Sequence, residues 1–164
     1  MRKLLLAAVL ILAACQEATP WRNIEPPDGS FTAKMPGVRL FERKGPTTVT
    51  WTGMAGHTQC MIQEFRDPQY TAAKAEETLR HYGDPRSADI DGKLVESGVV
   101  QSGPYTGKSV RIEGVVTAAR TPVVYLSRVF VADGRLYILS ANGKPGELNT
   151  AIADEFFQSF QLKK

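Results

Sequence analysis

The sequence contains few of the residues that usually build metal centres and nucleophilic active sites. Only two cysteines and two histidines occur among its 164 residues. No H-E-x-x-H helix and no G-x-S-x-G turn is present, and neither glycine-rich stretch, 53–56 or 103–107, matches the pattern of a phosphate-binding P-loop. We therefore expect a protein that is not an enzyme and that needs no metal or cofactor.

Charge of one sign is not in excess either. The chain has 20 basic and 17 acidic residues, and no run of lysine or arginine forms a basic stripe. Nucleic-acid binding therefore has no electrostatic support. The apolar run near the N-terminus, residues 4–12, is far shorter than the roughly 20 residues of a membrane-spanning helix. We expect neither a nucleic-acid partner nor a membrane span from this run.

Residues 1–14 have the layout of a secretory signal peptide. A basic start at Arg2 and Lys3 precedes the apolar run, and small residues follow it. The stretch 12–15, Leu-Ala-Ala-Cys, resembles the lipobox of bacterial lipoproteins. The resemblance implies cleavage before Cys15 and attachment of a membrane lipid to its sulfur. The alternative is an ordinary signal peptide cut at an A-x-A-like site, with Cys15 incidental.

The lipobox resemblance also implies a location. It places the protein in the bacterial cell envelope, held at the membrane by lipid. Gln16, rather than an aspartate, follows the cysteine. By the rules of proteobacterial lipoproteins this implies the outer membrane, with the domain facing the periplasm. Loss of 1–14 removes two basic residues, so the net charge of the mature chain is 18 − 17 = +1.

Lipid attachment at Cys15 leaves Cys60 as the remaining thiol. An exported domain with one thiol cannot form an internal disulfide. We expect Cys60 to be a small buried hydrophobic residue. The alternative is a reactive or metal-binding thiol near His57, although one cysteine and one histidine fall short of a zinc site.

Residues 15–28 are predicted to be a tether and residues 29–164 a single globular domain. The tether contains three prolines within eight residues, and proline-rich stretches remain extended and act as spacers. Trp21 is its only aromatic residue, and it would mark the end of the tether if it docks on the domain. The remaining length is normal for one domain with its own core.

Hydrophobic alternation with a period of two predicts an antiparallel sheet of about six to eight strands. Helical spacing over 71–82 interrupts the strands, and this helix is predicted to end at Gly83. The clearest hairpin is predicted at Asp133-Gly134, the dipeptide that a type I′ turn prefers. The expected strands cover residues 31–35, 38–43, 47–52, 57–65, 94–100, 108–117, 123–131 and 135–141.

The predicted strand 123–131 is apolar on both faces, which is typical of a sheet covered on both sides. A terminal helix is predicted to start between Pro145 and Asn149 and to run to about Ser159. Its apolar side chains recur every four residues, so it should pack on the sheet as a core element. These side chains are Leu148, Ile152, Phe156 and Phe160, with Phe157 beside them.

Several short motifs together resemble the PsbP-like family. They are Gly29-Ser30-Phe31, Met35-Pro36-Gly37, Arg128-Val129-Phe130, Gly134-Arg135-Leu136-Tyr137 and Phe156-Phe157-Gln158-Ser159-Phe160. The family includes the extrinsic photosystem II subunit, related bacterial envelope proteins and, by fold, a small nuclear-import factor that binds a GTPase. Over about 29–162 the resemblance implies an α+β fold with helices on both faces of an antiparallel sheet, an α/β/α sandwich. It also implies an accessory binding role, but the matching residues are strand ends and helix faces and transfer no site.

Three polar groups resemble parts of sites, and each has a plainer structural role. Asp89 and Asp91 recur as in a cation loop, but calcium takes six or more oxygens, so a polar loop is expected. Arg111 and Glu113 share one face of a strand, where a structural ion pair or an edge position is expected instead of catalysis. Arg128 projects among apolar neighbours, where a structural ion pair or an edge position explains it better than catalysis.

Three functional hypotheses remain. The first is a non-enzymatic, lipid-anchored accessory module that binds or assembles a protein partner in the envelope. The second is a carrier of a small ligand or lipid, which needs a cavity of about 300 Å³ or more between sheet and helix. The third is an enzyme with an unrecognised site. We expect the first, with the partner contacting the loops and an exposed sheet edge, because the helix faces are needed for the core.

Overall fold

The structure, a computed structural model, describes residues 19–82, 84 and 89–163. The signal peptide 1–14, the lipid-attachment residue Cys15 and Gln16 lie outside the described residues. The predicted helix end at Gly83 lies outside them as well. The signal peptide, the lipid anchor and the cellular location therefore stay predictions.

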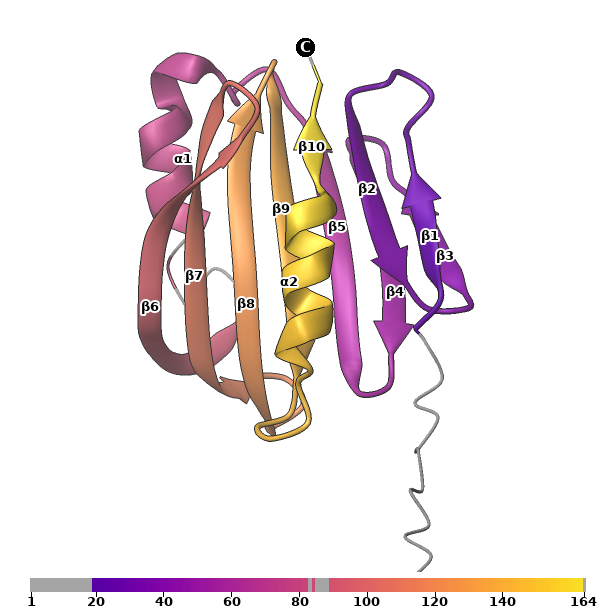
Figure 1. Cartoon of the computed structure of the whole chain (residues 1–164). Coiled ribbons are helices and arrows are strands. Elements are labelled where there is room, and N and C mark those ends of the chain that lie inside the picture. The colour runs from indigo at the N-terminus through magenta and orange to yellow at the C-terminus, as the bar shows by residue number, and fades with distance from the viewer. Residues whose placement is uncertain (1–18, 83, 85–88, 164) are drawn as a thin grey trace, which may run out of the picture.

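Seven antiparallel strands form the main sheet, in the order β3-β4-β5-β9-β8-β7-β6. Figure 1 shows them as one curved layer with β3 and β6 at its two edges. The predicted α+β class with mostly antiparallel strands is confirmed. The strands are β3 (Leu40–Lys44), β4 (Thr48–Ala55), β5 (Thr58–Arg66), β6 (Ile90–Ser102), β7 (Tyr105–Val116), β8 (Thr121–Ala132) and β9 (Arg135–Gly143).

A second, three-stranded sheet has the order β1-β2-β10. It contains β1 (Trp21–Ile24), β2 (Phe31–Pro36) and β10 (Gln161–Leu162). In β1, Trp21 pairs with Pro36 and Ile24 with Ala33. Residues 21–28, predicted as part of the tether, therefore belong to the folded domain, and Gly29 is too late a boundary. A strand of four residues between prolines is too short to show the alternation on which the prediction relied.

Two short helices complete the described chain. A 3-10 turn, Ala72–Lys74, leads into α1 (Ala75–Tyr82), and α2 spans Thr150–Ser159. The carboxamide of Asn149 accepts a hydrogen bond of 3.3 Å from the backbone N–H of Ile152, which fixes the start of α2. Both helices lie where the sequence predicts them. In the described residues no helix reaches the length and apolar character that a bilayer crossing requires.

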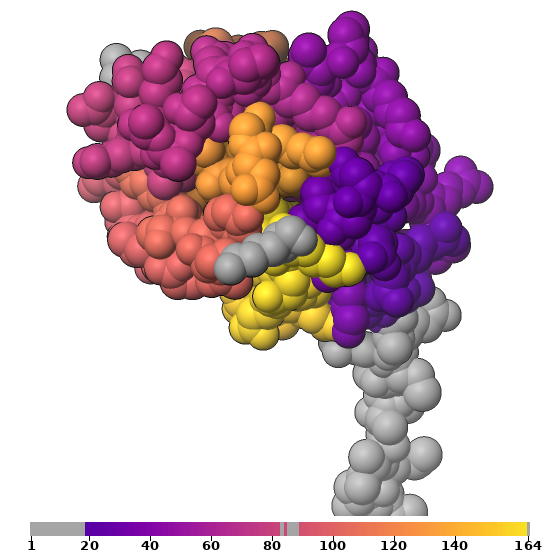
Figure 2. Space-filling model, turned by 90° about the horizontal axis from the view of Figure 1, so that it is seen from above, coloured from indigo at the N-terminus to yellow at the C-terminus, as the bar shows by residue number. Residues whose placement is uncertain are grey.

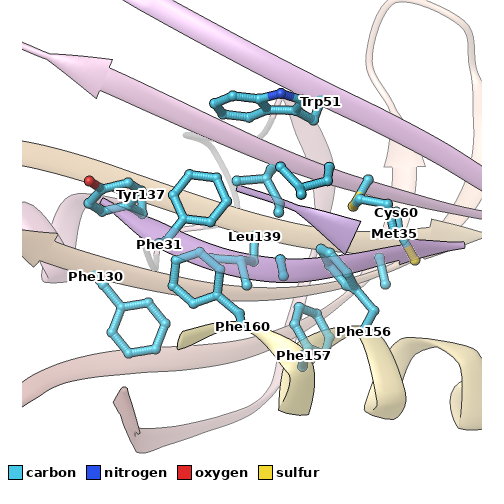
Figure 3. Packing of buried hydrophobic residues seen from close by; sticks show 14 of the residues in the cluster. Phe31, Met35, Trp51, Cys60, Phe130, Tyr137, Leu139, Phe156, Phe157 and Phe160 are labelled. Atoms are coloured by element: carbon cyan, nitrogen blue, oxygen red, sulfur yellow. The ribbon is translucent and has the colours of Figure 1, made fainter. Parts of the chain in front are cut away.

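Helix α2 and the small sheet cover one face of the main sheet and enclose the larger core. Phe31 of β2 stands 5.2 Å from Phe160 between ring centroids, and Phe160 lies 5.8 Å from Phe130 of β8 (Figure 3). Trp51 meets Phe31 edge-on at 5.3 Å. Contacts of this kind add to the free energy of burial because aromatic rings have a favourable relative geometry. The ring cluster therefore joins both sheets and α2.

The side chains that alternate with these core residues along β8 and β9 pack outside the larger core. Val129, Val131, Leu136 and Ile138 form a second cluster there, against which Leu79 and Tyr82 of α1 pack. Helix α1 is eight residues long, and none of its residues is fully buried. The described architecture is therefore two antiparallel sheets with two short helices. The hairpin prediction is confirmed: Asp133 and Gly134 have φ values of 48° and 76°, as a type I′ turn requires.

The larger core predicts how much stability a phenylalanine of α2 contributes. Phe156 of α2 is fully buried in the larger core. Replacing it with alanine removes an aromatic side chain and leaves a cavity, so Phe156→Ala should lower the free energy of unfolding by about 3–5 kcal/mol. Urea denaturation measures the change. Glu155→Ala, at an exposed position of the same helix, should change it by less than about 0.5 kcal/mol. Equal stability of both variants would show that α2 is peripheral.

Candidate functional site

Strand β6 forms one open edge of the main sheet. It pairs with β7 on one side, and no other described strand pairs with it. Residues 91–99 are exposed to solvent, and Val99 is 76% exposed. A β-bulge between Leu94 and Glu96 shifts the register with β7. A long edge strand of this kind presents unpaired backbone N–H and C=O groups together with exposed apolar side chains.

A groove of about 680 Å³ lies beside this edge, between α1 and the adjoining parts of β6 and β7. Ala75 and Leu79 line it from the helix, and Val99 and Lys108 line it from the two strands. Glu76 and Arg80 of α1 add charged groups to the lining. The groove exists because α1 packs on β8, two strands away from the edge. The edge and the groove together form the candidate site of this domain.

A network of four charged side chains lies at the end of the sheet that carries the β8–β9 turn. Glu64 of β5 is fully buried and accepts hydrogen bonds from Arg66 (2.8 and 3.2 Å) and Arg135 (2.7 Å). Arg135 also donates to Asp28 at 2.7 Å. Figure 2 looks onto this end, where the orange β8–β9 turn lies among the N-terminal loop, the β6–β7 hairpin and the C-terminal segment. A buried carboxylate needs such partners, because an unpaired charge is costly inside a protein.

The network also shifts the pKa values of Asp28 and Arg135. Burial raises the pKa of Asp28, but the hydrogen bonds from Arg135 and from the backbone N–H of Ser30 outweigh this effect and lower it from 3.8 to about 2. Burial lowers the pKa of Arg135, yet its hydrogen bond to Asp28 and the charge of Glu64 raise it overall. Each charge thus meets an opposite one. The ion pairs hold the β1–β2 loop against β9. We call the group of Asp28, Glu64, Arg66 and Arg135 the Asp28 clamp.

The Asp28 clamp predicts a dependence of stability on pH. The folded-state pKa is below the unfolded value of 3.8, so the contribution is fully present above about pH 4 and is lost as the pH falls through about 2. Asp28→Asn removes it. Because the side chain is 35% exposed, we expect a loss of only about 1 kcal/mol at neutral pH.

Urea denaturation of the wild type and Asp28→Asn across this pH range measures the contribution. The difference between the two proteins should shrink toward zero near pH 2. Asp91→Asn is the control, because Asp91 is exposed and makes no ion pair within the described residues. A difference that is constant with pH would contradict the clamp.

The structure separates the residues considered as a thiol site. Cys60 is buried in the larger core, and burial raises the pKa of its thiol to about 12. His57 lies in the β4–β5 turn, is largely exposed, and has Glu147 as its neighbour at 3.7 Å. Cys60 therefore has the environment expected of a small core residue, as the sequence predicts. Within the described ranges, no group of three or more His, Cys, Asp and Glu side chains is placed to hold a metal ion.

The remaining candidates take structural places. Arg111 donates to the carboxylate of Glu113 at 2.6 Å, which confirms the predicted ion pair. Arg128 lies 4.9 Å from the centroid of the Phe157 ring and donates to the Phe157 carbonyl at 3.3 Å. It therefore binds the end of α2 through a cation–π contact and a carbonyl. Asp89 has φ 54°, and its carbonyl accepts from the backbone N–H of Thr117.

Residues 103–109, Gly-Pro-Tyr-Thr-Gly-Lys-Ser, come within one residue of the P-loop spacing. In the structure they form the β6–β7 turn and the start of β7, and Lys108 lies on the strand. A P-loop binds phosphate at the N-terminus of the helix that follows it. The strand that follows here offers no such dipole, so the stretch is a hairpin.

Sequence reasoning missed both the β6 edge and the Asp28 clamp. The predicted strand 94–100 is confirmed and longer, but its place at an edge depends on the pairing order of all seven strands. Lys93, Glu96 and two glycines are a weak signal of an edge, since charged residues and glycines are common there. Asp28 and Arg135 are 107 residues apart, and no local pattern connects them.

Comparison with known proteins supports the fold. No protein-family model and no curated protein matches the sequence. The structure is similar to the solution structure of cyanobacterial PsbP from Synechocystis sp. PCC 6803, with a TM-score of 0.62 and 12% identity over 93% of this chain and 99% of that one. It is also similar to a Bacteroides thetaiotaomicron protein (TM-score 0.56, 12% identity, 87% of this chain), of which it spans about half, 48%.

A third solved structure, a Pseudomonas aeruginosa protein of unknown function described as a putative regulator, gives a TM-score of 0.51 and 10% identity over 84% of this chain and 92% of that one. Structural similarity at such low sequence identity establishes a shared fold but does not assign a role to any residue. The match to the cyanobacterial protein covers nearly all of it and 93% of this chain, which contains the antiparallel strands and the two helices described above. The chain has a PsbP-like fold.

Proposed function

We propose that this chain is a lipid-anchored protein of the bacterial cell envelope whose PsbP-like domain binds a protein partner and takes part in assembly, without catalysis. Cys15 is the lipid-attachment residue and residues 1–14 are the signal peptide in this proposal. Gln16 favours the outer membrane, with the domain facing the periplasm. Because β1 begins at Trp21, the tether consists of residues 15–20, shorter than the 15–28 predicted.

The observation that carries the binding role is the open β6 edge with its adjoining groove. An extended segment of a partner can add to a free edge by backbone hydrogen bonds, and pockets beside the edge then select its side chains. Strand β6 offers 13 residues for such pairing, and the groove of about 680 Å³ lies where a side chain of an added strand would project. The neighbouring apolar residues Leu79 and Val99 suit apolar side chains of the partner.

We further infer that α1 and α2 form layers on opposite faces of the main sheet, as an α/β/α sandwich would have. Two observations support this: α1 packs with Val129 and Val131, whereas Phe130 and Ala132 belong to the cluster that contains α2 residues. Alternate residues of a strand point to opposite faces. The shortness of α1 leaves room for the groove.

Lipid attachment predicts that radiolabelled palmitate enters the protein at Cys15. Cys60→Ala should retain the label, because Cys60 is buried, whereas Cys15→Ser should lose it. Two or three acyl chains make membrane attachment effectively permanent. The Cys15→Ser protein lacks them, so it should be mislocalised in cells or released from membranes by a high-salt wash. Equal retention and equal labelling of the two variants would refute the anchor.

The edge predicts a second result. A photo-reactive side chain at Val95 should cross-link one envelope protein in living cells, and Val99→Lys should reduce that product at least about tenfold, since a charge replaces an apolar contact. Val99 is exposed, so its substitution should leave the unfolding temperature unchanged. Gln158→Lys, which introduces the same side chain at an exposed position of α2, is the matched control. Equal cross-linking in both variants would exclude the β6 edge as the contact site of the partner.

A small-ligand or lipid carrier is the second candidate, and the size of the groove favours it. A volume of about 680 Å³ exceeds the roughly 300 Å³ at which ligand cavities begin. The same Val99→Lys variant separates the two candidates. If the domain is a carrier, native mass spectrometry of the purified protein should find a bound lipid that the Val99→Lys variant lacks. The yield of any cross-linked protein should then be the same with and without Val99→Lys.

A further inference from the structure

Three large apolar side chains are exposed at one corner of the domain. Val38 is 70% exposed, Phe41 61% and Met54 50%. Val38 lies in the β2–β3 loop, Phe41 on the edge strand β3 and Met54 near the end of β4. Single exposed apolar residues are common on protein surfaces, whereas a contiguous group usually marks a contact surface.

Phe41 and Met54 are neighbours on one face of the main sheet, and Val38 lies in the loop beside Met54. Phe41 pairs with Thr52, so it projects from the same sheet face as Met54 and lies diagonal to it. The β2–β3 loop lies against β4, because a Cβ placed on Gly37 would collide with the backbone of Met54. Gly37 has φ 108°, a conformation that favours glycine, and Val38 follows it directly. The corner is therefore one patch held by a fixed loop.

The described chain enters the domain at this same corner. The backbone N–H of Gly37 donates to the carbonyl of Pro20 at 2.8 Å, and Trp21 pairs with Pro36. Figure 1 shows the start of β1 at the same end of the domain as the end of β4. Cys15 is five residues before Pro20, and five residues span at most about 18 Å. A lipid on Cys15 thus keeps this corner near the bilayer.

The charges around the patch are mainly positive. Arg39 and Arg43 lie two residues to either side of Phe41, and Arg43 shares its face of the sheet; neither makes an ion pair within the described residues. Lys44 pairs with Glu42 at 3.3 Å. Residues 39–44 thus contain three basic residues and one acidic residue, 3 − 1 = +2. Basic side chains around an apolar patch suit the anionic headgroups and the acyl boundary of a lipid surface.

We propose that the corner of Val38, Phe41 and Met54 inserts into the interface of an anionic bilayer and fixes the orientation of the domain. The lipid surface is the single occupant of this patch. The inference rests on the proposed lipid anchor at Cys15, which brings the corner within reach of the membrane. Because β3 and β6 are opposite edges of the main sheet, the contact leaves the β6 edge directed away from the lipid.

The first test uses the mature chain that starts at residue 15 and carries Cys15→Ser. All described strands and helices lie between Trp21 and Leu162, so this chain keeps the whole fold without a lipid. It should sediment with vesicles of phosphatidylethanolamine and phosphatidylglycerol more than with vesicles of phosphatidylcholine. Phe41→Ser should weaken this partitioning at least about tenfold. Gln158→Ser, at an exposed position of α2 outside both the corner and the groove, should not change it.

Arg39→Gln combined with Arg43→Gln should remove the preference for phosphatidylglycerol and most of the dependence on salt, while the unfolding temperature stays the same. Equal partitioning of Phe41→Ser and Gln158→Ser would overturn the proposal. Self-association that Phe41→Ser abolishes, without vesicle binding, would assign the corner to a second copy of the chain and also overturn it.

The second test uses the lipidated full chain and does not depend on binding strength. Hydroxyl-radical oxidation of Met54 should fall several-fold when the protein moves from detergent micelles into phosphatidylglycerol-containing vesicles, and Val99 should be labelled equally in both. Equal labelling of Met54 in both media would refute the corner contact while leaving the anchor intact. A chain that takes up no palmitate at Cys15 would instead refute the anchor, and the vesicle assay with Cys15→Ser would still report on the corner.

Discussion

The packing of aromatic rings between the two sheets and α2 is the interaction on which the rest of the structure depends. Phe160 contacts Phe31 of the small sheet and Phe130 and Tyr137 of the main sheet. These rings come from β2 near the start of the described chain, from the β8–β9 hairpin and from the end of α2. Their burial removes a large apolar area from water, which is the dominant favourable contribution to folding. The same packing holds β1 and β10 in place, although both strands are too short to be stable alone.

Coverage of the main sheet is unequal, and this inequality creates the candidate binding surface. The larger core is closed by α2 and the small sheet, whereas α1 contributes two turns to the smaller cluster of β8 and β9 side chains. The groove beside β6 lies between α1 and the strands at the far edge. A domain with edge and groove both open can bind a partner without any rearrangement of its core. The proposed binding role follows from this open side.

The two edges of the main sheet differ in chemistry. At β3, exposed apolar residues adjoin arginines and the point where the chain enters the domain. At β6, a long strand with a bulge adjoins an apolar groove. The Asp28 clamp, at the end that carries the β8–β9 turn, fixes the β1–β2 loop. If lipid holds the first edge, as we propose, the second edge is directed away from the bilayer and is open to a protein partner.

The sequence by itself determined the local elements: the α+β class, the Asp133-Gly134 turn, both helices, and the burial of Cys60 and Phe156. These features depend on side chains a few residues apart, and hydrophobic periodicity or turn chemistry specifies them. It also predicts the anchor at Cys15, which lies outside the described residues. Only the tertiary structure decided that β2 leaves the main sheet, that β1 begins the domain at Trp21, that β6 is an edge, and that the exposed Val38, Phe41 and Met54 lie at one corner. Strand order and contacts of this kind depend on pairing between residues far apart in the sequence. No local sequence pattern predicts which residues pair.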